Sequence, residues 1–250
     1  MEAPKINFSP EELTRYNRQI LYPEWGLEGQ RRLKSATVFI AGVGGLGSPV
    51  SLYLAVAGVR KLRICDNGKV ELTNLNRQIL YTEEDVNQLK VVVAQEQLKR
   101  INPYVAVEFF SKTISSDTIE ELVGDADILV DCLDNFETRY FLNEYAVKKR
   151  IPFVHAGIEG LAGQITFIHH PYTPCLRCII PAAPPPKTFP VVGVTPGVVG
   201  CLEVNEVLKY LTGIGSNLKG ILLIWNGNDS EFHRIEIAKD PDCPVCSRGI

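Results

Sequence analysis

Residues 36–66 read ATVFIAGVGGLGSPVSLYLAVAGVRKLRICD, and this stretch decides the fold class. A short apolar run at 36–41 ends in glycines, residues 48–59 continue as an apolar helix, and residues 60–66 alternate as a second strand. The stretch therefore predicts one βαβ unit. The same glycines argue against a membrane span over the uncharged residues 36–59, because they divide the run into a strand, a turn and a helix.

The alternation of helices and strands continues on both sides of this unit. A capping box at Ser9 and Glu12, with Pro10 in the first helical position, predicts an N-terminal helix. Periodicity predicts further elements before residue 150, namely helices at 85–100, 117–123 and 136–150 and strands at 105–110 and 127–131. This order is typical of an α/β fold with a Rossmann-like, doubly wound parallel sheet.

The pattern changes in the C-terminal half of the chain. Strands are expected there without helical crossovers, so the sheet should continue as a mixed or antiparallel sheet. The expected elements are strands at 153–155 and 164–168, a capped helix at 195–211 with Pro196 in its first position, and a hairpin-like pair at 222–225 and 232–237.

One domain is expected over residues 1–250. The glycine-rich turn lies in the half at 1–150, and two pairs of cysteines lie in the half at 151–250. Residues 181–190 (PAAPPPKTFP) hold five prolines and show no periodicity. The loop 181–194 is therefore expected to be an extended, mobile segment.

Composition places the chain among ordinary globular proteins. Hydrophobic residues make up 45% and charged residues 22%, and 26 Lys and Arg against 29 Asp and Glu leave a formal charge of −3. Nucleic acid is not expected as the main partner, because the sequence pI is near 5.9. Residues 1–16 lack the basic start and apolar run of a secretion signal, so a cytoplasmic location is expected.

The turn Gly42-Val43-Gly44-Gly45-Leu46-Gly47 matches G-x-G-x-x-G between a strand and a helix, and Asp66 ends the next strand. Glycines let the backbone approach a phosphate, the helix N-terminus offers free N–H groups, and the acid accepts ribose hydroxyls. A nucleotide site is therefore predicted, with ATP and a nicotinamide dinucleotide both open. A kinase-type P-loop is excluded, since Ser48-Pro49 stand where that loop needs Lys and Ser or Thr.

Three further motifs accompany the turn: RYNRQ at 15–19, NLNRQ at 74–78 and DCLDN at 131–135. Together with the PDCPVC tail at 241–246, they resemble the MoeB/ThiF/HesA family of adenylating enzymes, and most closely its molybdopterin-synthase adenylyltransferases, over almost the whole chain. The resemblance implies activation of the C-terminal glycine carboxylate of a ubiquitin-like sulfur-carrier protein of the MoaD/ThiS type. The carboxylate attacks the α-phosphorus of Mg-ATP, pyrophosphate leaves, and an acyl-adenylate remains.

The resemblance also implies roles for single residues. Arg18, Arg77 and Lys90 would supply the positive charge that this turn, which lacks a P-loop lysine, does not provide. Asp134 would hold Mg²⁺, and Asp66 would bind the ribose. The nucleotide-binding set implied in this way is Gly42, Gly44, Gly45, Gly47, Asp66, Thr73, Asn74, Asn76, Arg77, Lys90, Asp134 and Asn135.

Partners follow from the same resemblance. A homodimer is expected in which Arg18 reaches into the ATP site of the neighbouring subunit. A groove that ends near Asp134 should take the flexible Gly-Gly tail of the carrier, with the half at 151–250 binding the carrier and the loop 181–194 covering the tail. One departure from the family is the run Asp66-Asn67-Gly68, where relatives usually carry an acid at the third position.

Four of the seven cysteines form two C-x-x-C pairs, the arrangement of a closed tetrahedral zinc site. Such a site would be structural and would pin the C-terminal tail to the region before the proline-rich loop. A redox role would need a helix that starts at the first cysteine of a pair, and none is predicted there. The expected zinc ligands are Cys175, Cys178, Cys243 and Cys246.

The other cysteines, Cys65, Cys132 and Cys201, are expected to be small buried thiols, and only Cys201 stays open for a role in sulfur chemistry. Many relatives carry one more cysteine before the penultimate helix for a persulfide or thioester step, and residues 186–194 contain none. The reaction is therefore expected to stop at the adenylate, with a separate sulfur donor completing the pathway.

Three alternatives to carrier adenylation stay open. A nicotinamide-dependent dehydrogenase accounts for the glycine turn and Asp66, but leaves the other motifs and the cysteine pairs unexplained. A catalytically silent relative would only bind a partner. Adenylation of another acyl substrate, such as a peptide or a tRNA base, is excluded by no residue, and the sequence does not distinguish a molybdopterin from a thiamine pathway.

Overall fold

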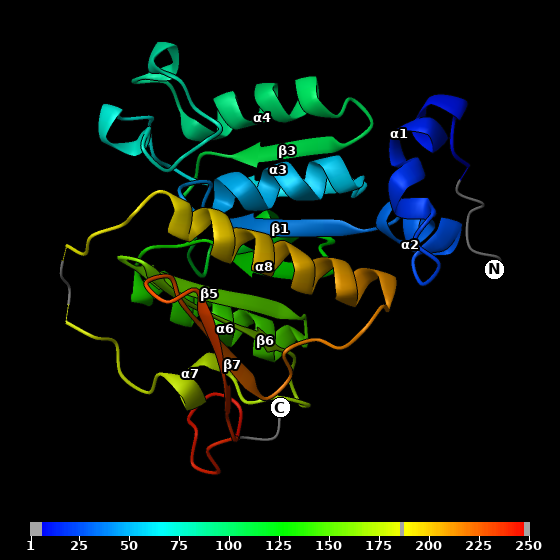
Figure 1. The fold of residues 1–250 in the computed structure, drawn as a ribbon. Coiled ribbons are helices and arrows are strands. Elements are labelled where there is room, and N and C mark those ends of the chain that lie inside the picture. Colours follow the sequence, from blue (N-terminus) through cyan, green and yellow to red (C-terminus); the bar gives the residue numbers. More distant parts are fainter. Residues whose placement is uncertain (1–6, 186–187, 248–250) are drawn as a thin grey trace.

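The structure is a computed structural model that describes residues 7–185 and 188–247. Its strands are β1 (Thr37–Ala41), β2 (Lys61–Cys65), β3 (Ala106–Phe110), β4 (Ile128–Asp131), β5 (Phe153–Glu159), β6 (Ala162–Ile168), β7 (Ile221–Asn226) and β8 (Glu231–Glu236). They form one sheet in the order β3-β2-β1-β4-β5-β6-β7-β8 (Figure 1). Pairs from β3 to β5 are parallel and pairs from β5 to β8 are antiparallel, which confirms the predicted fold class.

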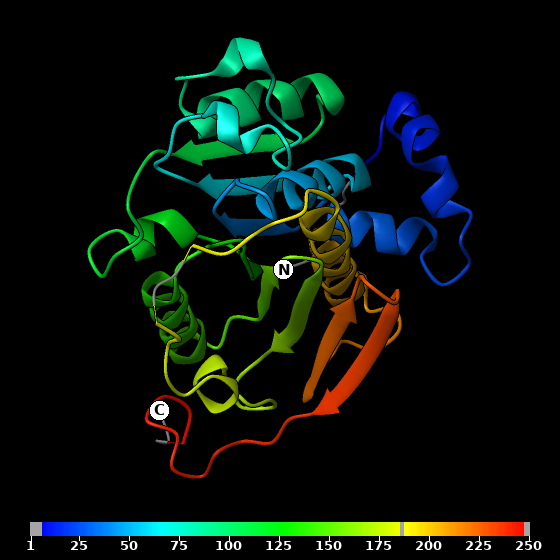
Figure 2. The ribbon, with the colours of Figure 1, turned by 60° about the vertical axis from the view of Figure 1, so that its left-hand side comes forward.

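Helices cover both faces of the sheet, as a doubly wound fold requires. One face is covered by α3, α4 and α8, and the other by α5, α6 and α7, while α1 and α2 lie together at one end of the molecule (Figures 1 and 2). The helices are α1 (Pro10–Ile20), α2 (Gly26–Leu33), α3 (Gly47–Ala57), α4 (Lys90–Ile101), α5 (Ile119–Val123), α6 (Phe136–Lys149), α7 (Leu176–Ile179) and α8 (Val194–Thr212).

The central strand β1 is buried on both faces, which explains its uninterrupted apolar sequence. Val38 and Ile40 point to the core beneath α3, α4 and α8, whereas Phe39 and Ala41 point to the core beneath α5 and α6. The glycine turn therefore starts from a strand that is buried at every position, which holds its backbone in place.

The helix predicted at 85–100 begins only at Lys90, so that prediction is wrong at its N-terminal end. Asn87 has a φ of 74° and donates its N–H to the carbonyl of Val70 (2.9 Å), and the N–H of Val70 donates to the carbonyl of Gln88 (2.9 Å). These long-range bonds hold the segment as a loop against residues 69–70. Lys90 consequently stands in the first turn of α4.

Two other helices differ from expectation. The short α2 has no counterpart among the predicted elements. The helix expected at 195–211 begins at Val194, and no side chain caps it. Thr195 donates its hydroxyl to the carbonyl of Gly160 (2.7 Å) instead, so it ties α8 to the turn between β5 and β6.

The C-terminal part of the proline-rich loop is bonded to the same turn. The N–H of Gly160 donates to the carbonyl of Pro190 (2.7 Å), and the N–H of Val192 donates to the carbonyl of Gly160 (3.3 Å). Residues 186 and 187 lie outside the described residues, and the mobility expected of 181–194 stays a prediction. In the described part of the chain, no helix is both long and apolar enough to cross a bilayer.

Candidate active site

The glycine turn connects the C-terminal end of β1 to α3. Gly42 has a φ of 92°, and a Cβ there would lie 2.8 Å from the carbonyl oxygen of Cys132. A Cβ on Gly47 would lie 2.1 Å from the carbonyl oxygen of Gly42. These two glycines are needed by the turn itself, whereas the nearest atom to a Cβ on Gly44 or Gly45 is 3.4 Å away or more. At the start of α3, the N–H of Ser48 donates to the carbonyl of Gly44 (2.9 Å), the N–H of Val50 donates to that of Leu46 (3.1 Å), and Pro49 has no N–H. The N–H groups suited to an anion are therefore those of the glycine turn that leads into the helix.

Asp66 lies at the end of β2, beside the glycine turn. One carboxylate oxygen accepts the N–H of Val43 (2.9 Å) and the other accepts the N–H of Gly68 (2.7 Å). A Cβ on Gly68 would lie 3.0 Å from Asp66 Oδ1 and 3.5 Å from Lys90 Nζ. The structure therefore brings Lys90 to the side of Asp66, and the glycine that departs from the family pattern leaves room for it.

The NLNRQ motif folds over the glycine turn. Arg77 is half-buried, and its Nη1 donates to the carbonyl of Thr73 (2.8 Å) and to Asn76 Oδ1 (2.9 Å). Its Cδ lies 3.8 Å from a Cβ built on Gly45. Asn74 is buried, and its side-chain oxygen accepts a backbone N–H of the same loop (3.1 Å). The loop thus holds a guanidinium next to the turn, with Thr73 and Asn76 orienting it.

The segment after β4 separates the two acids of DCLDN. Asp131 is fully buried and bonds to His155, whereas Asp134 is exposed. β2 and β4 both pair in parallel with β1, so their carboxyl ends lie on the same side of the sheet. Asp66 and Asp134 each come after one of these ends. Asn135 accepts the N–H of residue 138 (2.9 Å) and caps α6, which gives it a structural bond in addition to its expected place near the nucleotide.

Arg18 is exposed on α1 and does not reach the glycine turn of its own chain. The neighbouring Gln19 donates to the carbonyl of Ala57 (3.1 Å), the last residue of α3. An 11-residue helix is about 16 Å long, and the glycine turn lies at the opposite end of α3 (Figure 1). Arg18 therefore stands apart from the residues that the structure brings together.

Gln78 joins the site although the sequence did not single it out as a binding residue. It is 5% exposed, and its Nε2 lies 3.5 Å from a Cβ built on Gly44. Its Oε1 has no hydrogen-bond partner within the described residues. A buried acceptor next to a glycine turn is available to a hydrogen-bond donor from a water or a ligand. The only signal in the sequence is its place at the end of NLNRQ.

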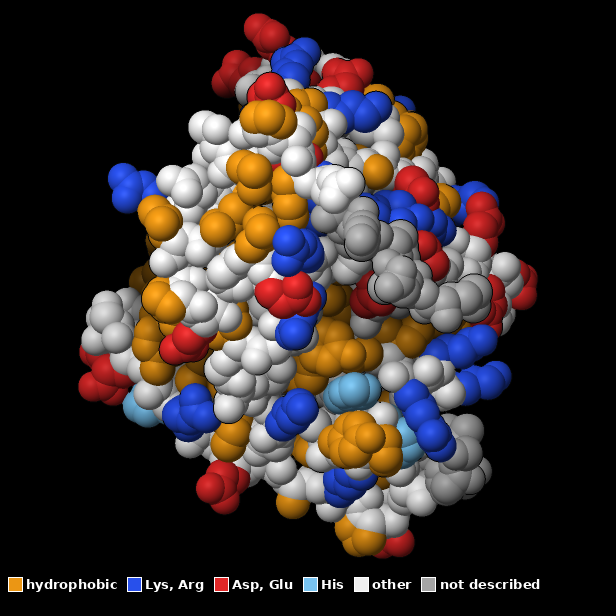
Figure 3. All heavy atoms as spheres, turned by 90° about the vertical axis from the view of Figure 1, so that its right-hand side faces the viewer, with side chains coloured by type: hydrophobic (Ala, Val, Ile, Leu, Met, Phe, Trp, Pro, Cys, Tyr) orange, Lys and Arg blue, Asp and Glu red, His pale blue; other side chains and the backbone are white. Residues whose placement is uncertain are grey.

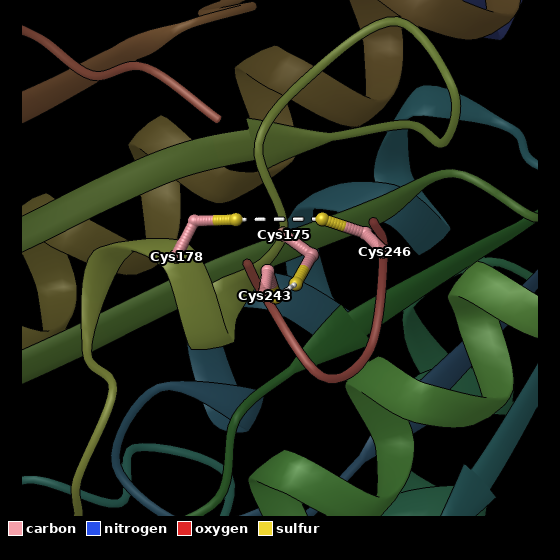
Figure 4. Close-up of side chains that lie close together, drawn as sticks. All are labelled: Cys175, Cys178, Cys243 and Cys246. Atoms are coloured by element: carbon pink, nitrogen blue, oxygen red, sulfur yellow. Dashed lines mark hydrogen bonds between the residues drawn. The ribbon is translucent and has the colours of Figure 1, made fainter. Parts of the chain in front are cut away.

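The two C-x-x-C pairs meet in one cluster. The four Sγ atoms lie within 4.8 Å of one another, with 3.6 Å between Cys175 and Cys243 and 3.4 Å between Cys178 and Cys246 (Figure 4). The cysteines are not joined by disulfides. Zn–S bonds of 2.3 Å in a tetrahedron place sulfurs about 3.8 Å apart. The cluster therefore fits a closed four-sulfur zinc site.

A short helix does begin at the first cysteine pair, contrary to expectation. Cys175 is the N-cap of the four-residue helix α7. The metal interpretation does not depend on that point, because Cys243 and Cys246 from the C-terminal tail complete the cluster. Burial raises the pKa of Cys175 to about 11, so its thiolate needs a nearby cation to be stable there.

The remaining cysteines divide into two kinds. Cys65 and Cys132 are buried as expected, and burial raises both pKa values, that of Cys65 to about 12. Cys201 is exposed on α8, so the expectation of a buried thiol is wrong for it. Partial desolvation raises the pKa of Cys201 as well, which keeps it a protonated and weakly nucleophilic thiol near neutral pH.

Comparison with known proteins identifies the family of the chain. The ThiF family model matches residues 16–245. The sulfur carrier protein adenylyltransferase of Thermus thermophilus is 42% identical over 252 residues, which cover 96% of this chain and 93% of that protein. The adenylyltransferase and sulfurtransferase MOCS3 of Mus musculus is 40% identical over 253 residues, covering 98% of this chain and 55% of MOCS3, so the chain spans about half the length of that relative.

Solved structures show the same fold. E. coli MccB in a crystal structure with ATP has a TM-score of 0.82 at 27% identity, over 93% of this chain and 73% of MccB. MccB with MccA-N7isoASN has a TM-score of 0.84 at 27% identity, over 93% of this chain and 74% of MccB. With a family model that matches nearly the whole chain and relatives at about 40% identity over almost all of it, the chain belongs to the ThiF family.

Proposed function

We propose that this chain adenylates the C-terminal glycine carboxylate of a ubiquitin-like sulfur-carrier protein of the MoaD/ThiS type. The chain is an adenylyltransferase that uses ATP, in line with its family, with the names of its relatives and with the ATP complex of MccB. The observation that carries the proposal is the guanidinium of Arg77, held by Thr73 and Asn76 beside the glycine turn. That arrangement suits a triphosphate in a site without a P-loop lysine.

The residues at the turn account for the main electrostatic demand of the reaction. A carboxylate oxygen bonds to the α-phosphorus while the bond from that phosphorus to pyrophosphate breaks, so like charges meet and negative charge builds on the leaving group. Arg77 and Lys90 would hold the phosphates, and N–H groups of the glycine turn before Ser48 would add to them. Asp66 would accept the ribose hydroxyls and thereby orient the nucleotide.

Asp134 would hold Mg²⁺. An exposed carboxylate at the edge of a parallel sheet fits this ion, which prefers oxygen ligands and usually binds through one or two carboxylates and substrate phosphates. When bound, the ion neutralises negative charge on the phosphate oxygens. The chain's own contribution would be to hold the Asp134 carboxylate after β4, the strand next to the one that leads into the glycine turn.

Exchange of labelled pyrophosphate into ATP tests the proposal. We expect exchange that depends on a carrier ending in Gly-Gly and that is absent with a carrier lacking its last residue. Cys201→Ala should exchange at the wild-type rate within about twofold, because a surface thiol with a raised pKa takes no part in forming an adenylate. Absence of exchange with MoaD-type and ThiS-type carriers alike, while ATP still binds, would contradict the carrier proposal.

We also propose a homodimer that completes each site with Arg18 of the other subunit. α1, the turn that follows it and α3 expose apolar side chains, namely Leu13, Leu21, Tyr22, Tyr53 and Val56. Figure 3 looks onto the side of the molecule where α1 and α2 lie and shows hydrophobic side chains interspersed with Lys and Arg on this face. Arg18 lies on the same helix and about the length of α3 from its own glycine turn.

Mixing two inactive variants tests the dimer. Arg18→Ala and Arg77→Ala should each lose exchange alone, and subunit exchange between them should restore it. Random mixing restores about one quarter of the sites, since half of the dimers are mixed and each mixed dimer has one intact site. If activity stayed at the level of the single variants although mixed dimers formed, Arg18 would not act across the interface.

The remaining assignments complete the proposal. Residues 1–150 bind the nucleotide, and residues 151–250 bind the carrier and a structural zinc ion through Cys175, Cys178, Cys243 and Cys246. The loop 181–194 covers the carrier tail, and a separate sulfur donor acts on the adenylate. The cluster of four sulfurs within 4.8 Å and the bonds from Gly160 to residues 190–192 support the zinc and loop assignments.

A second candidate is adenylation of a peptide. It is favoured by the likeness to MccB, which has been crystallised with MccA derivatives. The carrier remains the first candidate, because the relatives at about 40% identity include proteins named for a sulfur carrier and for sulfur transfer. The dehydrogenase alternative loses its support with membership of the ThiF family.

A further inference from the structure

A buried polar cluster lies behind the turn that carries Asp134. It combines Asp131 at the end of β4, His155 on β5 and Arg139 on α6, and each is less than 8% exposed. Asp131 and His155 are directly paired in the register of β4 and β5. None of these residues belongs to the site assigned above, and their burial keeps them from touching a nucleotide at the surface.

The hydrogen bonds of the cluster converge on the residue before Asp134. Asp131 Oδ2 lies 2.6 Å from His155 Nδ1, and Asp131 Oδ1 accepts the N–H of Leu133 (3.1 Å). Arg139 donates through Nη2 to the carbonyl of Leu133, and its Nε lies 3.4 Å from Asp131 Oδ2. The N–H and the carbonyl of Leu133 are therefore both held by the buried ion pair of Asp131 and Arg139. Asp134 is the next residue in the chain, so its backbone is held as well.

The charges of the cluster are balanced. Burial lowers the pKa of His155 despite the neighbouring carboxylate, so the ring is neutral and donates its Nδ1 proton to Asp131. Glu203 of α8 also faces the cluster, and burial together with Asp131 raises its pKa, so it is a neutral acid. This leaves one carboxylate, that of Asp131, opposite one guanidinium, that of Arg139. Asp131 and Arg139 are also bonded to His155 and to the Leu133 backbone, as a buried pair requires. Arg139 Nε, His155 Nε2 and both carboxyl oxygens of Glu203 have no hydrogen-bond partner within the described residues.

We infer that Asp131, His155 and Arg139 are positioning residues that hold the Leu133 backbone so that the Asp134 carboxylate faces the bound metal–nucleotide. The inference rests on the proposed function, in which Asp134 holds Mg²⁺. Groups that orient a metal ligand typically change metal affinity by roughly 10–100-fold when they are removed. Their loss should therefore weaken the response to Mg²⁺ without changing the binding of metal-free ATP.

The experiment compares ATP binding by the full-length, zinc-loaded protein with and without Mg²⁺, by calorimetry. The ratio of the two Kd values should fall about tenfold in His155→Ala. His155→Asn, whose amide can take the place of Nδ1–H, should restore most of it. In Asp134→Ala the two Kd values should be equal, so Mg²⁺ should no longer strengthen ATP binding. The matched control is Thr166→Val, because Thr166 is fully buried, is paired with His155 in the register, and loses a hydrogen bond to the carbonyl of Ile221 (2.8 Å).

The outcomes separate this inference from the proposed function. His155→Ala and Thr166→Val should both lower Tm, but only His155→Ala should lower the Mg²⁺ response. An equal Mg²⁺ response in the two variants would overturn the positioning role, as would a wild-type protein whose ATP binding gains nothing from Mg²⁺. The wild-type protein could also show the Mg²⁺ response, with the variants behaving as expected, but no carrier-dependent exchange. That result would support the positioning role and contradict only the proposed acyl substrate.

Discussion

Replacing Arg77 by alanine is expected to lower carrier-dependent ATP–pyrophosphate exchange by about 10³-fold, because cations that stabilise a transferring phosphoryl group contribute effects of this size. Arg77 is held in place by two hydrogen bonds beside the glycine turn. No carboxylate pairs with it within the described residues, so its charge is available to a ligand. The measurement is kcat/KM for ATP in the exchange reaction, with the carrier at saturating concentration.

Two further variants make the test specific. Arg77→Lys keeps the charge but loses the planar donor pair that bonds Thr73 and Asn76, and it should recover only part of the rate. Arg100→Ala removes an exposed arginine from the far end of α4 and should leave exchange unchanged. Loss of the same size in Arg100→Ala would indicate a general effect of charge, and retention of more than about a tenth of the rate in Arg77→Ala would contradict the assigned role.

Removing zinc is the second change for which we expect a large effect, this time on stability. Cys243→Ser should lose the metal and lower the free energy of unfolding by about 4 kcal/mol, which for a chain of this size lowers Tm by about 10 °C. Cys243 and Cys246 belong to the core cluster beneath α6 and α7, so a released tail would expose apolar surface there (Figure 2). Metal content by mass spectrometry and Tm by calorimetry measure both effects.

Cys65→Ala is the matched control. Cys65 is a buried cysteine outside the cluster, and its thiol donates to the carbonyl of Lys112 (3.2 Å). The variant should keep one zinc ion per chain and lose less stability than Cys243→Ser. A chelated protein whose Tm equals that of the zinc-loaded protein would show that the metal does not pin the tail.

Local chemistry explains why much of the fold is predictable from sequence. The run 36–66 holds an apolar strand, a turn and a helix, and each is set by periodicity or by glycine within a few residues. Gly42 and Gly47 are required by the backbone itself, since a Cβ on either would lie within 3 Å of a carbonyl oxygen. The capping box of α1 is equally local, and it forms as predicted.

The parts that sequence reasoning missed depend on contacts between distant residues. Lys90 stands at the start of α4 because residues 87 and 88 bond to Val70. Whether such a pairing forms is decided by loop closure and by competing partners, which no short window of sequence contains. The exposure of Cys201 has the same origin, since it depends on which side of α8 the sheet covers.

The sequence by itself therefore determined the βαβ nucleotide-binding unit, the change from a parallel to an antiparallel sheet, and the four sulfur ligands, because each rests on residue types at fixed short spacings. Only the tertiary structure decided that Arg77 and Gln78 lie over the glycine turn, that Arg18 lies far from it, and that Asp131, His155 and Arg139 meet behind Asp134. The physical reason is that a packed core brings together side chains from separate strands and helices, and it does so by burying area and pairing charges across the whole fold.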